Sequence, residues 1–340
     1  MAAATVPRHP SGPERVRGPF FDELRVGQVF DTAPGVTLTS GLQAQHSAVV
    51  GNRLPLALDH ELATRVSGGP LAGPALVCDV SIGQSTLATQ HVRANLSYRG
   101  LLFSRQPLLG DTLHTTTTVQ ALRENGRRPG RPATGLALLR ITTTDQLGRA
   151  VLDYRRCAML LCSPDATPTG HVDELPPAAD LPGSADLFGS VATWDVGAWP
   201  ARPTGPWAVG RSWDVLGADL VSSAPELARL TGNLARVHHD ASAAGGARLV
   251  YGGHTIGIAL HHLTQAVPGV LTVAGWHSCD HTAPVHEGDV LTSTVTVESV
   301  HPGLGGLTAL GLDVATSTTT AHDEAPGSLV LRWRPVVLVA

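Results

Sequence analysis

The sequence predicts an α+β protein made of two copies of one unit, each a long helix wrapped by an antiparallel sheet. Several short segments recur in the same order about half a chain apart, and each copy ends in long runs of β-branched and apolar residues. One long period with two copies indicates duplication of a whole domain rather than a solenoid. The recurring pairs are Val26–Gly27 with Val209–Gly210, Gly51–Asn52 with Gly232–Asn233, Ser81–Gly83 with Thr255–Gly257, and Gly110–Leu113 with Gly288–Leu291.

The chain of 340 residues is long enough for two domains, each with a core of its own. We expect a first domain at residues 18–163, a linker at 164–205 and a second domain at 206–340. The linker is predicted because that stretch is rich in Pro, Ala, Gly and Asp and has few apolar clusters.

Each copy is expected to contain a short strand, a helical stretch, a turn with glycine, a second helix and then long strands. Two such units can pair their sheets edge to edge, which covers one exposed edge of each. The expected strands are Leu113–Leu122, Thr134–Thr144 and Ala150–Cys162 in the first copy, and Val290–Val300, Leu307–Thr316 and Ser328–Val339 in the second.

The second helix of the C-terminal copy is predicted from Gly253 to Ala266. Its apolar residues at Ile256, Leu260 and Leu263 follow spacings of four and three, which places them on one face. On this pattern the pair His261–His262 is expected on the exposed side.

The composition argues against several classes of protein. The net charge is −4, 42% of the residues are apolar and 15% are charged, as in a globular protein rather than a nucleic-acid binder. No apolar run is long enough to span a membrane, and no secretory leader is recognisable. The four cysteines lack paired zinc-ligand spacing, which favours a reduced, cytoplasmic setting. Apart from histidine, every basic residue is arginine, which suits bidentate phosphate contacts.

The two copies differ where chemistry is expected. After its Gly–Asn pair the second copy reads Val237-His238-His239-Asp240, whereas the first reads Leu56-Ala57-Leu58-Asp59. Alanine therefore stands in the first copy where the second has His238. Such asymmetry predicts one working site and one scaffolding half.

The segment around His238 has the parts of an acid–base site. A loop after Gly232 is expected to present Asn233 and His238, and Gly252–Gly253 stands at the start of the predicted helix. Unpaired N–H groups and the positive end of the helix dipole favour an anion there, such as the enolate of a thioester. An imidazole nearby can move a proton. The alternatives are a packing histidine and glycines that serve the turn alone.

These residues and their order resemble the MaoC-like, R-specific (type 2) enoyl-CoA hydratases, whose motif is Ser-Gly-Asp-x-Asn-Pro-Leu-His-x-Asp followed by His-Gly-x-x-Thr-x-Gly. The resemblance implies a double hotdog fold with its working site in the C-terminal hotdog. It implies that His238 is the catalytic histidine, that Gly252 is the oxyanion glycine, and that Asp240 ends the motif. The stretches at residues 93–100 and 250–255 look most like the mesaconyl-CoA hydratase branch.

The chain departs from the motif at several positions. The catalytic aspartate is replaced by Asn233, the motif proline by Arg236, and the histidine before the oxyanion glycine by Tyr251; the motif asparagine is Ala235. An amide can orient water but cannot act as a carboxylate base. We therefore expect His238 to transfer the proton and Asn233 to position water, with Asp240 or His239 as a second polar partner. Arg236 is expected to pair with a carboxylate on the substrate.

Two further groups have competing interpretations. Alternate residues of a strand could bring His277, Cys279 and His281 together as metal ligands, but no second ligand pair accompanies them. We favour a strand whose polar face lines a pocket or meets the other half, and predict no metal. The arginines Arg93, Arg99 and Arg105 either contact the phosphates of coenzyme A or form a solvated face; we favour contact.

The function expected from the resemblance is a hydratase/dehydratase that interconverts a 2-enoyl-CoA and a 3-hydroxyacyl-CoA. It implies no cofactor besides the coenzyme A of the substrate, no nucleic-acid or membrane partner, and a monomer or homodimer. The alternatives are a non-catalytic acyl-CoA-binding protein with a decayed site and, less favoured because of Asn233, a thioesterase.

Overall fold

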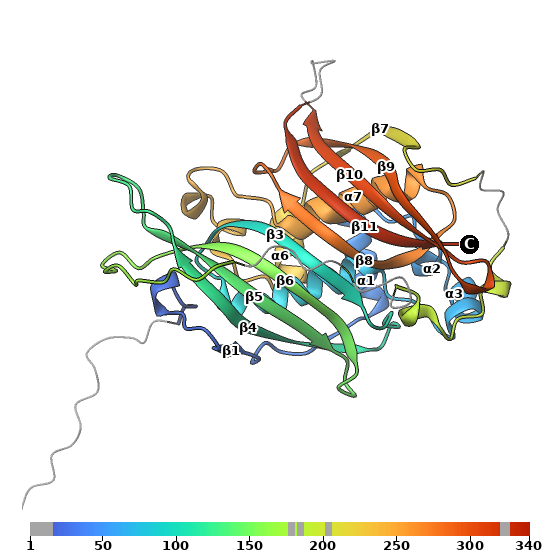
Figure 1. Cartoon of the computed structure of the whole chain (residues 1–340), viewed down its shortest axis with the longest axis horizontal. Helices are drawn as coiled ribbons and strands as arrows, with labels where there is room; N and C mark the ends of the chain where they lie inside the picture. The colour runs from blue at the N-terminus through green and yellow to red at the C-terminus, as the bar shows by residue number, and fades with distance from the viewer. Residues whose placement is uncertain (1–15, 176–180, 182–186, 201–205, 320–326) are drawn as a thin grey trace, which may run out of the picture.

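The computed structural model describes residues 16–175, 181, 187–200, 206–319 and 327–340. Within these residues the chain forms one antiparallel sheet with helices against it, as predicted (Figure 1). The strands of the first half are β1 (Val29–Phe30), β2 (Val36–Thr37), β3 (Val92–Phe103), β4 (Thr112–Glu124), β5 (Thr134–Thr144) and β6 (Ala150–Leu161). Those of the second half are β7 (Ser212–Leu220), β8 (Val270–His281), β9 (Val290–Pro302), β10 (Thr308–Thr319) and β11 (Leu329–Val339).

The strand order shows how the two halves join. Along the sheet it is β1-β4-β5-β6-β3-β8-β11-β10-β9-β7, with β2 paired to β4. The seam is the antiparallel pair β3–β8, in which Tyr98 lies opposite Cys279 and Leu102 opposite Gly275. A Cβ at Gly275 would collide with the carbonyl oxygen of Leu101, so glycine allows the two backbones to approach. The predicted edge-to-edge pairing is confirmed.

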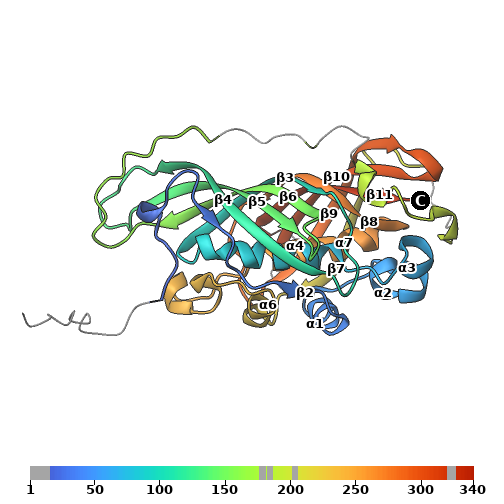
Figure 2. The same ribbon diagram turned by 90° about the horizontal axis from the view of Figure 1, so that it is seen from below.

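The helices are α1 (Ser40–Val50), α2 (Pro55–Leu58), α3 (His60–Ser67), α4 (Pro74–Gln84), α6 (Ala224–Leu230) and α7 (Gly252–Ala266). Figure 2 shows them gathered on one side of the sheet, with α4 and α7 next to it. Because α4 and α7 pack against each other as well as the sheet, most of their residues are buried. The six strands predicted at the ends of the two copies, and helix α7, lie within a few residues of their expected bounds.

The expected exposure of the His261–His262 pair is wrong. His262 is completely buried, and its ring nitrogens bond to Ser293 Oγ and Asp219 Oδ2, each at 2.8 Å. The side chain of His261 is 17% exposed. The reason is that β7 and β9 cover the side of α7 that a single-helix pattern assigns to solvent.

The predicted linker, residues 164–205, lies only partly within the described residues, which there include two short 3₁₀ turns. Among the described residues, no helix has both the length and the hydropathy needed to cross a membrane.

Candidate active site

A cavity of 490 Å³ lies at the start of α7 and is walled by both halves of the chain. Helix α7 begins at Gly252, directly after Tyr251 in extended conformation, and no side chain caps its first turn. The first N–H groups of a helix have no partner within it, so this end favours an anion. The polar or ionisable residues on the walls are Arg93, Asn95, Tyr98, Arg156, Asn233, His238, Tyr251, Thr255, His281, Thr282 and His286.

His238 lies on the cavity wall in a defined protonation state. Its Nδ1 lies 2.8 Å from the carbonyl oxygen of Leu249, and because a carbonyl only accepts, Nδ1 carries the proton. The other ring nitrogen, Nε2, therefore has a lone pair. Burial lowers the pKa of His238 to about 4, so the imidazole is neutral at physiological pH. A neutral imidazole with an unprotonated Nε2 is able to act as a base.

The loop that presents His238 is anchored to the first half. The N–H of Leu234 donates to Thr86 Oγ1 at 2.9 Å, and the N–H of Arg236 donates to the carbonyl of Gln90 at 3.3 Å. Within the loop, His239 Nε2 donates to the carbonyl of Asn233 at 2.7 Å. The first half thereby helps to position the histidine of the second.

Asn233 has a structural role as well as a place on the cavity wall. Its Oδ1 accepts the N–H of Ala235 at 2.9 Å, and in the first half Asn52 accepts the N–H of Leu54 in the same way at 3.0 Å. Both are side-chain turns that span two residues. With its oxygen bonded in this way, Asn233 has its amide nitrogen to offer to a ligand.

Not all of the sequence-predicted residues meet at the cavity. His238, Asn233, Gly252, Tyr251 and Arg93 line it, with Arg93 exposed at the rim. The remaining three, Arg236, Asp240 and Arg99, are not among the residues of its walls.

The three residues outside the walls have other partners. Arg236 has a side chain 66% exposed and pairs with Asp240 at 3.0 Å. Asp240 caps the turn Ala241–Ala244, and hydrogen bonds from Ser242 and Arg236 lower its pKa to about 2. Arg99 pairs with Asp280 across the seam between β3 and β8.

Arg156 was not predicted from the sequence; it lies on β6 and is only 3% exposed. Its Nε donates to Asn95 Oδ1 at 2.7 Å and its Nη1 to Ser85 Oγ at 3.0 Å. No ion pair to Arg156 exists among the described residues. A signal was present in the sequence, because Arg156 lies two residues from Tyr154 and from Ala158 along an expected strand and so shares their face, which the structure shows to be buried. A buried guanidinium without a carboxylate favours an anionic ligand.

For the segment that contains His281, the sequence favoured a strand whose polar face lines a pocket or meets the other half, rather than a metal site. It is the last residue of β8 and lines the cavity beside Gly252. Within the described part of the chain, no group of three or more His, Cys, Asp or Glu side chains is arranged to hold a metal ion.

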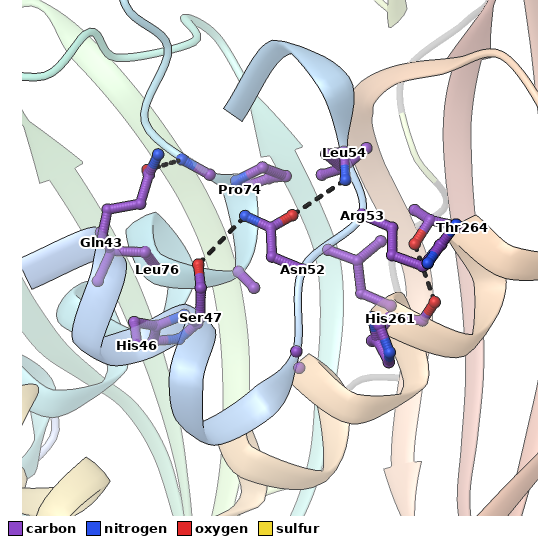
Figure 3. A pocket seen from close by; sticks show the side chains of 15 residues that line it. Gln43, His46, Ser47, Asn52, Arg53, Leu54, Pro74, Leu76, His261 and Thr264 are labelled. Carbon is purple, nitrogen blue, oxygen red and sulfur yellow. Dashed lines mark hydrogen bonds between the residues drawn. The ribbon is translucent and has the colours of Figure 1, made fainter. Parts of the chain in front are cut away.

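The Gly–Asn turn of the first half lies at a much smaller pocket of 20 Å³, which residues of α7 also line (Figure 3). There the N–H of Gly73, directly before α4, donates to Gln43 Oε1 at 2.7 Å. Asn52 bridges Ser47 Oγ and the N–H of Leu54, as the dashed lines in Figure 3 show. Several polar groups of this pocket therefore bond to one another or to the backbone beside it.

This fold and site define the chain as a double hotdog with a large cavity at the start of α7. No family model matches the chain. It is 50% identical, over 95% of its length and 99% of the other chain, to a solved structure with a TM-score of 0.86. That protein, from Mycobacterium tuberculosis, is described as conserved and hypothetical, as essential for bacterial survival during infection, and as having a double hotdog fold.

Two further relatives are enzymes by name. The chain is 29% identical to β-methylmalyl-CoA dehydratase of Chloroflexus aurantiacus over 90% of each chain. It is also 29% identical to mesaconyl-CoA hydratase of Cereibacter sphaeroides, over 85% of this chain and 87% of the relative. A putative MaoC domain dehydratase from Chloroflexus aurantiacus shares the fold with a TM-score of 0.85 at 24% identity, over 96% of this chain and 99% of the other. The chain therefore belongs with the Mycobacterium tuberculosis protein to the double-hotdog proteins, and it is similar to CoA-thioester hydratases and dehydratases.

Proposed function

We propose that the chain is a hydratase/dehydratase that interconverts a 2-enoyl-CoA and a 3-hydroxyacyl-CoA. The observation that carries this proposal is the neutral His238, whose Nδ1 is bonded to Leu249, on the wall of the same cavity as Gly252 at the start of α7. A base and an anion-stabilising helix end are the two elements that addition of water next to a thioester requires. Two relatives that this chain matches over most of their length are named for the same class of reaction, which supports the proposal.

The proposed hydration begins with water attacking the β-carbon of the enoyl thioester. Nε2 of His238 takes a proton from this water as the new C–O bond forms, and the electrons of the double bond move onto the thioester oxygen. The N–H of Gly252 and the α7 dipole stabilise the resulting enolate. The imidazolium then returns the proton to the α-carbon, which leaves His238 neutral. Dehydration is the reverse, and neither direction draws on a metal or redox cofactor.

Two other residues are given binding roles in this proposal. The amide nitrogen of Asn233 donates a hydrogen bond to the reacting water. Asn233 thereby positions the water as the aspartate of the motif would, but it does not transfer a proton. The exposed Arg93, at the rim of the cavity, is placed to contact the phosphates of coenzyme A.

The buried Arg156 supports an acyl group that itself carries a carboxylate. A cation 97% buried and held by the neutral partners Asn95 and Ser85 gains most from an anionic ligand. The acyl groups in the names of both relatives, mesaconyl and methylmalyl, carry such a carboxylate. In this assignment Arg156 takes the role that the sequence suggested for Arg236.

The test is mass-spectrometric detection of water addition to a panel of trans-2-enoyl-CoAs that includes crotonyl-CoA, longer chains and mesaconyl-CoA. Wild type is compared with His238→Ala, and with His60→Ala as an exposed histidine outside the cavity walls. We expect turnover in wild type and His60→Ala, and its loss in His238→Ala. Full turnover in His238→Ala would refute the assignment of the base.

The same panel separates the alternative functions. Release of free thiol would identify a thioesterase. Thermal stabilisation by acyl-CoAs without turnover of any of them would identify a binding protein with a decayed site.

A further inference from the structure

We propose that His281 is a second hydrogen-bond donor to the thioester oxygen and acts together with the N–H of Gly252. This inference rests on the proposed function and adds a catalytic residue to it. The sequence motif has no counterpart for such a donor, because His281 is the last residue of β8, the strand after α7, and lies outside both segments of the motif.

The first observation is the contact between His281 and Gly252. A Cβ at Gly252 would lie 2.7 Å from His281 Nε2 and 2.9 Å from its Cε1, so the ring edge packs against the glycine backbone. Glycine at this position is therefore required for the imidazole to approach the start of α7. The ring nitrogen and the Gly252 N–H thus stand at the same end of the cavity.

The second observation is that Nε2 of His281 is buried and has no hydrogen-bond partner among the described residues. A buried polar atom left without a partner costs about 1–3 kcal/mol, and such exceptions in folded proteins call for an explanation. A ligand oxygen at the start of α7 supplies the partner that the protein does not.

The third observation concerns the charge of the ring. Burial, with smaller contributions from Arg156 and His238, lowers the pKa of His281 to about 4. The ring is therefore neutral at physiological pH and carries a single N–H. We assign that proton to Nε2, because the group it meets, a thioester oxygen, only accepts. The ring edge of His281 also meets the Tyr98 ring, with the two centroids 6.0 Å apart, which helps to hold its orientation.

A neutral N–H donor suits the chemistry of this step. Negative charge grows on the thioester oxygen as water adds, so a fixed donor stabilises the transition state more than the bound substrate. The donor keeps its proton throughout, so His281 needs no acid or base to restore it. This role differs from that of His238, which accepts and returns a proton.

The experiment compares His281→Phe and His281→Gln with wild type on the best enoyl-CoA substrate of the panel. Phenylalanine fills the space of the ring without a donor, and we expect kcat to fall about 10²–10³-fold with little change in KM. Glutamine restores an N–H, and we expect it to recover at least about tenfold of that loss. The matched control is His301→Phe, which replaces an exposed histidine on β9 outside the cavity and leaves kcat unchanged.

A spectroscopic measurement separates a donor from a proton-transfer group and does not need turnover. Butyryl-CoA labelled with carbon-13 at its carbonyl is bound to each variant, and the carbonyl stretch is recorded by difference infrared spectroscopy. We expect a higher frequency in His281→Phe than in wild type, and no such change in His238→Ala. An unchanged frequency in His281→Phe, or a His281→Gln variant as slow as His281→Phe, would overturn the proposal. Absence of any wild-type turnover would instead contradict the proposed function, while the infrared comparison still tests the hydrogen bond.

Discussion

Gly83 of α4 lies so close to the backbone carbonyl of Thr231 that a Cβ at this glycine would collide with the oxygen. The equivalent glycine of α7, Gly257, packs against the side chain of Val50, the residue before the Gly–Asn pair of the first half. Each helix therefore rests on the turn of the opposite half. The repeated glycines mark where the two halves interlock, and Thr231 directly precedes the Gly–Asn pair that leads to His238.

Gly83→Ala is expected to lower the free energy of unfolding by about 1–3 kcal/mol, because a backbone carbonyl cannot move aside as a side chain can. The measurement is urea unfolding, with Gly126→Ala as control, since a Cβ there meets open space. Equal stability of the two variants would show that the helix and turn have more room than the structure indicates.

Arg156→Gln is expected to change substrate preference. Removal of the buried cation should cost roughly 2–5 kcal/mol of binding for a substrate that pairs with it, a KM increase of about thirtyfold or more. Plain enoyl-CoAs should be affected less. The check is the ratio of kcat/KM for mesaconyl-CoA and crotonyl-CoA, with the exposed Arg236→Gln as control. An unchanged ratio in Arg156→Gln would show that the substrate carboxylate does not pair with Arg156.

Stability is expected to fall as the pH drops from about 6.5 to about 4. Burial lowers the pKa values of His238 and His254 to about 4 in the folded chain, whereas unfolded histidine titrates near its ordinary value of 6.5. In this window the unfolded state binds more protons, so acid favours it. His254 is completely buried and neither ring nitrogen has a partner among the described residues.

Replacement of His254 tests that relationship. His254→Leu should lose less stability between pH 7 and pH 5 than wild type in urea unfolding, whereas replacement of the exposed His60 by leucine should leave the difference as it is. An identical loss in His254→Leu and wild type would show that this ring does not cause the acid sensitivity.

Arg93 and Arg99 are expected to differ in their effects on coenzyme A binding. Arg93→Ala should raise KM, more strongly at low salt, because it removes an exposed charge at the cavity rim. Arg99→Ala should leave KM near wild type and lower stability by at most about 1 kcal/mol, because its partner Asp280 is half-exposed. The measurement is steady-state kinetics of both variants at two salt concentrations. A larger increase in KM for Arg99→Ala than for Arg93→Ala would assign the contact with coenzyme A to Arg99 instead.

Much of the fold could be predicted from the sequence because its signals are local. The runs of β-branched and apolar residues along β5 and β6, the apolar spacing in α7 and the repeated turn glycines each act over a few residues. His238, Asn233 and Gly252 were found for the same reason, since each lies in a short contiguous motif. Nearness in sequence also misled, because Arg236 and Asp240 flank His238 but bond to each other away from the cavity walls.

The sequence by itself determined the duplication, the α+β class and the half that holds His238, the proposed base, because these follow from local periodicity and from the difference between the copies. Only the tertiary structure decided that Arg156 of the first half and His281 of β8 share a cavity with His238. The meeting of Arg156 with the two histidines depends on the β3–β8 pairing, which places the wall strands of the first half beside the helix end of the second. Contacts between segments so distant in sequence arise from packing, and no local pattern encodes them.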